Sequence, residues 1–128
     1  METHQLSFAN INILRPDIAE VIVNEDIEMD LTMVAEYHQF LQTHLTSPFS
    51  LLINKINAYS YTFEAQTQLA TISEINAMAV VIYSKSAALA TTYLNNNSLR
   101  NHPWNLEIFT DRKSALLWLE NQQFNTSM

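Results

Sequence analysis

Residues 57–62 carry hydroxyl and aromatic side chains directly before a segment that is predicted to be helical. Ser60 and Thr62 lie where the free N–H groups and the dipole of a helix N-terminus favour an anion or a phosphoryl group. Capping of the helix by one of these hydroxyl groups is the competing interpretation. Tyr59 and Tyr61 are of a residue type common at protein interfaces, or one of them packs against the sheet edge. Together with Asn57 these residues form a candidate interaction site.

Ser84, Lys85 and Ser86 form a second polar segment, between an apolar strand and a predicted helix. Their hydroxyl groups, amine and backbone donors suit a carboxylate or a phosphate, which makes them a candidate anion or ligand rim. A capped helix with a solvated lysine is the alternative, because no glycine is present to let the backbone wrap around an anion.

Carboxylates and histidines are present, but their spacing matches no metal site. Residues 25–30 contain four acidic side chains without the pattern of a calcium loop. His38 and His44 are six residues apart, whereas a zinc pair on a helix is separated by about four. No local pattern pairs a nucleophile with a base or one carboxylate with another. We therefore predict no metal, no cofactor and no enzymatic activity.

The chain has no glycine and no cysteine among its 128 residues. Phosphate-binding loops, dinucleotide fingerprints and nucleophile elbows all need glycine where the backbone takes a positive φ or closely approaches a ligand. The absence of cysteine excludes thiolate catalysis, cysteine-containing zinc sites and disulfides, and it fits a reducing compartment. Asparagine tolerates positive φ better than most residues, so we expect it to serve as the turn residue.

The net charge of the chain argues against two further classes of binding protein. Thirteen acidic and six scattered basic residues give a net charge of −7, which disfavours binding to nucleic acid or to an anionic membrane surface. No apolar run is long enough to span a membrane, and the N-terminus lacks the features of a signal peptide. We expect a cytoplasmic protein, without membrane insertion, whose partners are proteins or small molecules.

The hydrophobic pattern predicts strands and helices that alternate after an opening hairpin. Strands are expected at residues 6–14, 18–24, 49–56, 77–83 and 104–109. Helices are expected at residues 30–45, 62–72 and 86–94 and after Asp111. Asp30 and Asp111 are the predicted N-caps. Phe63 is expected on a buried helix face, and residues 95–98 are expected to end the third helix. Residues 49–56 are apolar on both faces, as in a central, largely parallel strand. The predicted fold is one α/β domain with a mixed sheet of about five strands and four helices, in the order ββαβαβαβα.

Ligands of open α/β sheets gather outside the carboxyl ends of the strands. Three predicted connections should meet at that edge, at residues 57–62, 84–86 and 110–112. We therefore expect any functional site to lie on this rim.

The order of elements, the length and the ending Ile108-Phe-Thr-Asp-Arg-Lys-Ser-Ala-Leu-Leu-Trp-Leu119 resemble the SpoIIAA-like group of the STAS superfamily. The resemblance covers nearly the whole chain. In the anti-sigma factor antagonists of this superfamily, a serine or threonine at the start of the second helix is phosphorylated within an Asp-Ser-Ser-Gly-like motif. Ser60 and Thr62 take that place here, but the loop has neither the aspartate nor the glycine. The resemblance thus implies a regulatory or interaction domain without the usual phosphorylation motif.

Two functions remain open at this point. The first is a regulatory module that docks another protein, or a second copy of itself through a hairpin edge or an apolar helix face, with residues 57–62 as its interaction or switch site. The second is a small-ligand binding domain for a lipid or nucleotide, as found in some members of the wider superfamily. Its apolar pocket would lie between the sheet and the helices, near Tyr37, Phe40, Met78 or Tyr83.

Overall fold

The computed structural model describes residues 2–97 and 105–127. One sheet contains six strands in the order β1-β2-β3-β5-β7-β8, and β4 and β6 form a separate pair. The strands are β1 (Glu2–Gln5), β2 (Ala9–Arg15), β3 (Ile18–Val23), β4 (Glu28–Met29), β5 (Phe49–Asn54), β6 (Ser60–Tyr61), β7 (Ile75–Val81) and β8 (Leu106–Phe109). The helices are α1 (Leu31–His44), α2 (Phe63–Gln68), α3 (Lys85–Asn97) and α4 (Arg112–Ser127).

The predicted mixed α/β fold is confirmed. Strands β2 and β3 form the expected antiparallel hairpin, and β5 pairs in parallel with β3 on one side and with β7 on the other. Strand β8 continues the parallel half beside β7. The sheet gains one strand over the prediction, because β1 pairs antiparallel with β2 and covers the free edge of the hairpin. The edge available for strand pairing on this side is therefore β1 and not the hairpin.

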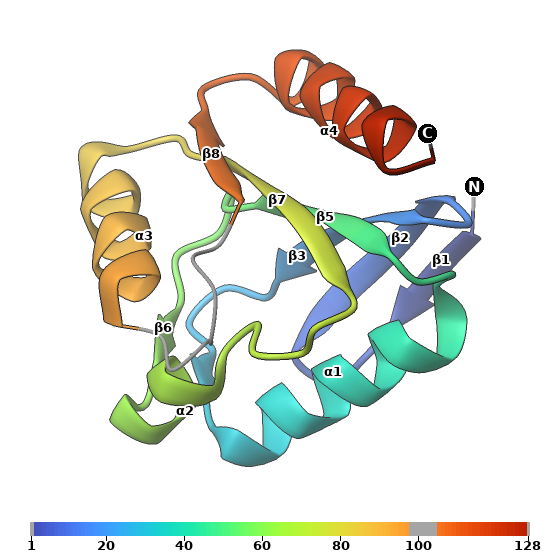
Figure 1. Cartoon of the computed structure of the whole chain (residues 1–128). Helices are drawn as coiled ribbons and strands as arrows, with labels where there is room; N and C mark the ends of the chain where they lie inside the picture. The colour runs from blue at the N-terminus through green and yellow to red at the C-terminus, as the bar shows by residue number, and fades with distance from the viewer. Residues whose placement is uncertain (1, 98–104, 128) are drawn as a thin grey trace.

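The helices are divided between the two faces of the sheet, with α4 on one face and α1 and α2 on the other (Figure 1). Side chains alternate along each strand, so neighbouring residues of one strand serve different faces. Leu51 and Met78 belong to the larger core beneath α1, whereas Leu52 and Ala79 belong to the smaller core beneath α4. The parallel strands are therefore apolar on both faces, as their sequence predicts.

Helix α4 approaches the sheet over small residues. Ala77 and Ala79 of β7 and Ala115 of α4 are at most 1% exposed, and Leu119 completes this contact. The short alanine side chains allow the helix to pack closely against the strand. Only this middle part of α4 is held by apolar contacts, whereas polar side chains near its two ends reach the sheet.

Helix starts agree with the sequence signals. The Asp30 carboxylate accepts a hydrogen bond from the Met33 amide at 2.9 Å, and the Asp111 carboxylate accepts one from the Ser114 amide at 2.8 Å. Each aspartate thus satisfies a donor that has no partner within the helix. Both predicted N-caps are confirmed.

Helix ends and burial differ from the prediction in three places. Helix α2 stops at Gln68 instead of continuing to residue 72, and Phe63 at its start is 72% exposed rather than buried. A helix of under two turns has no room for a full apolar stripe, so its first residue turns to solvent. Helix α3 continues through Asn97, so the asparagine run does not stop it at residue 95. Trp104, which the prediction placed in the last strand, lies outside the described residues.

Positive φ values fall on residues other than asparagine. Among the described residues, Asp26 has φ 63° and Ala70 has φ 54°, so the expectation that asparagine takes these positions is wrong. Aspartate tolerates the left-handed region, but alanine does so only when its surroundings hold it there. The Ala70 amide donates to Nε2 of His38 at 3.1 Å, which helps to hold this backbone in place. Burial lowers the pKa of His38, although the Glu74 charge opposes this, so the ring remains a neutral acceptor.

Within residues 2–97 and 105–127, no helix combines the length and the apolar character needed to cross a membrane.

Candidate functional site

Residues 57–62 are held in the fold by side-chain and backbone hydrogen bonds. The Asn57 side-chain amide donates to the carbonyl of Val23 at 3.0 Å. Ser60 and Tyr61 form β6, and the Ser60 amide donates to the carbonyl of Ile27 at 2.9 Å. These contacts hold the segment beside the carboxyl ends of β3 and β5, as the topology predicts.

Thr62 is the N-cap of α2. Its Oγ1 accepts a hydrogen bond from the Ala65 amide at 3.1 Å, which is the capping alternative for this residue. The Ser60 residue precedes the cap and is exposed. The two hydroxyl residues of the segment therefore have different surroundings, with Thr62 engaged by the helix and Ser60 open to solvent.

Tyr59 and Tyr61 turn inward and do not form an exposed aromatic surface. Both are half-buried and line a cavity on the α1 and α2 face of the sheet. Their rings meet edge to face with centroids 5.5 Å apart, and the Tyr61 hydroxyl donates to the Tyr59 hydroxyl at 3.3 Å. The aromatic pair thus belongs to the wall of an internal site.

The cavity has a volume of about 50 Å³. Its floor consists of β3, β5, β7 and β8, which contribute Val21, Val23, Ile53, Met78, Val80 and Leu106, and Tyr37 of α1 forms part of its cover. Leu69, Ala70 and Thr91 close it on the sides of α2 and α3. Of the four residues that the sequence places near a pocket, Tyr37 and Met78 line this one, whereas Phe40 and Tyr83 do not.

Lys55 also lines this apolar cavity. The residue directly follows β5, and its backbone amide donates to the carbonyl of Val81 at 3.0 Å, which holds it at the carboxyl end of the sheet. Its ammonium group lies 5.6 Å from the centre of the Tyr59 ring. No carboxylate lies within 4 Å of this group among the described residues. Burial therefore lowers the pKa of Lys55 to about 8.

Three phenols share the cavity with this amine. Burial raises the pKa of Tyr59 to about 12, although its hydrogen bond with Tyr61 acts in the opposite direction. Burial also raises the pKa values of Tyr37 and Tyr61, and the nearby Tyr59 phenol adds to both shifts. All three hydroxyl groups consequently keep their protons at neutral pH. Because the Tyr61 proton is donated to Tyr59, the protons of Tyr37 and Tyr59 are the ones available for a ligand.

The sequence reasoning missed Lys55. The available signal was a lysine placed directly after a strand that is apolar on both faces, four residues before the first of two tyrosines. A lysine in that position lies at the carboxyl end of the strand, beside the segment that follows it in the chain. The alternation of the strand does not reveal which face the lysine takes, because both faces are buried.

Ser84, Lys85 and Ser86 lie apart from the cavity. The Ser84 hydroxyl accepts a hydrogen bond from the Ala87 amide at 3.1 Å, and the side chains of Lys85 and Ser86 are exposed at the start of α3. The segment therefore has the capped helix and solvated lysine that the alternative interpretation describes. None of its three residues lines the pocket.

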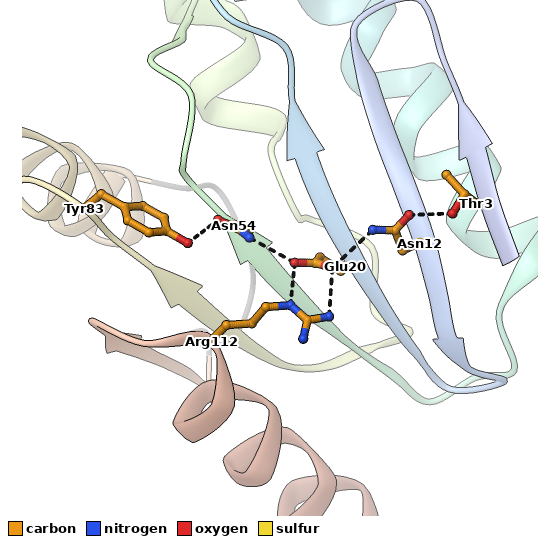
Figure 2. A network of polar contacts seen from close by, with 6 residues as sticks. All are labelled: Thr3, Asn12, Glu20, Asn54, Tyr83 and Arg112. Atoms are coloured by element: carbon orange, nitrogen blue, oxygen red, sulfur yellow. Dashed lines mark hydrogen bonds and ion pairs between the residues drawn. The ribbon is translucent and has the colours of Figure 1, made fainter. Parts of the chain in front are cut away.

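A second polar cluster lies on the α4 face, around Glu20 of β3 (Figure 2). The Glu20 carboxylate is 3% exposed and accepts two hydrogen bonds from Arg112, at 2.9 and 3.0 Å. Asn54 donates to it at 3.0 Å and Asn12 at 3.2 Å, so each carboxylate oxygen has two donors. The Tyr83 hydroxyl in turn donates to the Asn54 side chain at 2.9 Å. This arrangement explains why Tyr83 is not part of the pocket.

The acceptor capacity of Glu20 is already used within the protein. Burial by itself raises the pKa of this carboxyl, but hydrogen bonds from Arg112, Asn54 and Asn12 and the Arg112 charge outweigh it and hold the pKa below its usual value. A saturated, ionised carboxylate has no free oxygen for a metal or a substrate proton. The described residues contain no group of three or more side chains placed to hold a metal ion. The cluster therefore fastens α4 to the sheet.

Comparisons of the chain with protein-family models, with curated proteins and with solved structures found no match. The cavity face holds an amine and phenols with unused hydrogen-bonding capacity, and the α4 face holds a cluster that is satisfied internally.

Proposed function

We propose that this protein binds a small apolar molecule in the cavity between the sheet and helices α1, α2 and α3. The observation that carries the proposal is an apolar cavity of about 50 Å³ whose wall includes one amine and three protonated phenols. Ligand sites are typically apolar with a few polar groups that orient the ligand. We further propose that the protein acts by binding and not by turnover, and that it works in the cytoplasm.

A ligand screen tests this proposal. Thermal unfolding is followed with a panel of two- to six-carbon alcohols, ketones and carboxylic acids, and native mass spectrometry checks the protein for retained ligand. We expect at least one compound class to raise the melting temperature, because a ligand that binds only the folded state stabilises it by mass action. A Leu106→Trp variant, whose indole fills the cavity, should lose the shift, whereas Leu117→Trp on the exposed side of α4 should keep it. The absence of any shift and of any retained mass would refute the proposal.

A regulatory docking domain of the SpoIIAA-like kind is the second candidate. The exposed side chains of Ile56 and Phe63, at 59% and 72%, favour it because they flank residues 57–62. Exposed apolar and aromatic residues beside a polar segment are common in protein interfaces. Membership of the STAS superfamily is part of this candidate, with Ser60 as the accessible hydroxyl.

Affinity capture from the native cells tests the docking candidate. We expect a partner protein, or a second copy of the chain, to be retained by the natural sequence and to be lost with Phe63→Ser. The variant Leu89→Ser is the matched control, since Leu89 is 73% exposed on α3. The intact mass of the native protein shows in the same experiment whether Ser60 carries a phosphate. Monomeric behaviour at high concentration without a captured partner would count against this candidate.

A further inference from the structure

Resting on the proposed binding function, we infer that the ligand is a small apolar monocarboxylic acid whose carboxylate pairs with the Lys55 ammonium group inside the cavity. The charge and the hydrogen-bond donors of the cavity select the head group of the ligand, and the volume of the cavity limits its hydrocarbon chain.

The Lys55 charge has no counter-ion among the described residues, although the ammonium group lies over the Tyr59 ring, 5.6 Å from its centre. Lys55 is the cation among the residues that line the cavity, and no described carboxylate lies within 4 Å of its ammonium group. Glu25 is exposed, and its carboxylate accepts a hydrogen bond from the Ala58 amide instead. A partly buried cation without a counter-ion is unfavourable, so an anion that enters the cavity removes this cost. One cation suits a monoanion and would leave a phosphate dianion undercompensated.

The hydrogen-bonding groups beside Lys55 are suited to an acceptor. The Tyr61 hydroxyl donates to that of Tyr59, which leaves the Tyr59 proton available for a further hydrogen bond. The Tyr37 hydroxyl makes no hydrogen bond with any part of the described chain. An ionised carboxylate only accepts hydrogen bonds, and bonds of this kind with an ammonium group or a phenol are charge-assisted. The amine and the two phenols therefore match a carboxylate better than an amine or an amide.

The volume of the cavity limits the length of the ligand's hydrocarbon chain. At about 50 Å³, the cavity exceeds the 10–15 Å³ that one water molecule needs and is smaller than the ~150 Å³ of a cavity that binds benzene. The walls beyond these polar groups are mostly valine, isoleucine, leucine and methionine side chains, together with Phe8, Ala70 and Thr91. Met29 and Met78 can change rotamer to accommodate a few more atoms. The cavity as it stands suits a carboxylate with about two carbons, and a chain of about four to six carbons enters once Met29 and Met78 have changed rotamer to widen it.

Titration with hexanoate and with hexan-1-ol, which have the same chain length, separates the head group from the tail. We expect the natural protein to bind hexanoate, and Lys55→Met to bind it about 10- to 100-fold more weakly, as befits the loss of a charge-assisted contact. Binding of hexan-1-ol should be unchanged or stronger in Lys55→Met. The variant Lys85→Met is the matched control, because this exposed lysine lies outside the cavity. It should bind hexanoate like the natural protein.

Two further measurements guard against a merely structural effect. Lys55→Met should melt at a higher temperature than the natural protein at pH 7, because it removes an uncompensated charge from a partly buried position. Tyr59→Phe keeps both the charge and the ring, and we expect it to weaken hexanoate binding about three- to tenfold. The inference would be overturned if Lys55→Met and the natural protein bound hexanoate with equal affinity. It would also be overturned if the natural protein preferred hexan-1-ol. Either result would leave the binding function in place. Binding of neither probe, together with no hit in the wider panel, would refute the binding function itself.

Discussion

Replacing Arg112 by methionine is expected to lower the free energy of unfolding by about 3 kcal/mol at pH 7, because it leaves an uncompensated charge inside the protein. The substitution removes both hydrogen bonds that Arg112 donates to Glu20 (Figure 2). Glu20 is 3% exposed, and the two asparagines that remain beside it carry no charge. Urea denaturation followed by circular dichroism measures the loss, which should appear as a shift of the midpoint at constant slope.

The effect of Arg112→Met depends on pH in a defined direction. In the natural protein the pKa of Glu20 lies below its usual value of 4.5, so its contribution to stability is complete above about pH 4.5 and is lost as the pH falls further. Burial is the largest single influence on this pKa, and removing Arg112 deletes two of the influences that oppose it, so we expect the pKa of Glu20 to rise in the variant. The variant then loses stability as the pH rises through this raised pKa. The two proteins should therefore differ least near pH 4 and most at neutral pH.

Two variants control this experiment. Lys113→Met removes the neighbouring exposed cation and should change the free energy of unfolding by less than about 0.5 kcal/mol. Adding Glu20→Gln to Arg112→Met removes the stranded charge and should recover about half of the lost stability. If Arg112→Met and Lys113→Met were equally stable at pH 7, the ion pair would not hold α4 to the sheet.

The second large effect is expected near the other end of α4. Gln123 is 2% exposed, and its amide nitrogen donates to the Asp17 carboxylate at 2.9 Å and to the Pro48 carbonyl at 3.0 Å. Its amide oxygen accepts from the Ser50 hydroxyl at 2.5 Å and from the Asn76 side chain at 3.0 Å. Gln123→Leu keeps the volume but removes these four hydrogen bonds, which should cost about 2–3 kcal/mol because the partners stay behind in a water-poor site.

Thermal unfolding of Gln123→Leu measures this loss, and Asn121→Leu on the exposed side of the same helix is its control. A loss of 2–3 kcal/mol corresponds to a fall in melting temperature of about 6–10 °C for a chain of this size. The control should stay within about 2 °C of the natural protein. A Gln123→Leu variant as stable as the control would mean that the apolar middle of α4 is sufficient to dock it.

Much of the fold follows from local patterns in the sequence. Asp30 and Asp111 are acidic residues directly before amphipathic segments, and a cap needs only such nearby groups. Residues 49–54 are apolar at four of six positions, with three apolar residues in succession at 51–53, which indicates a strand covered on both faces without reference to any partner. The end of α2 could not be predicted in this way. Ala70 takes a left-handed conformation because it is held by His38, which is 32 residues away in the chain.

The sequence by itself determined the class of fold, the caps and the position of the rim, since each depends on hydrophobic period or on side chains within one turn. It also determined that glycine-based and cysteine-based chemistry is excluded. Tertiary structure alone decided that Tyr59 and Tyr61 face inward and that Lys55 joins them. It also decided that Glu20 binds an arginine 92 residues further along the chain. The physical reason is that burial, ion pairing and pKa depend on which side chains the folded chain brings within a few ångströms, and no local spacing encodes those distances.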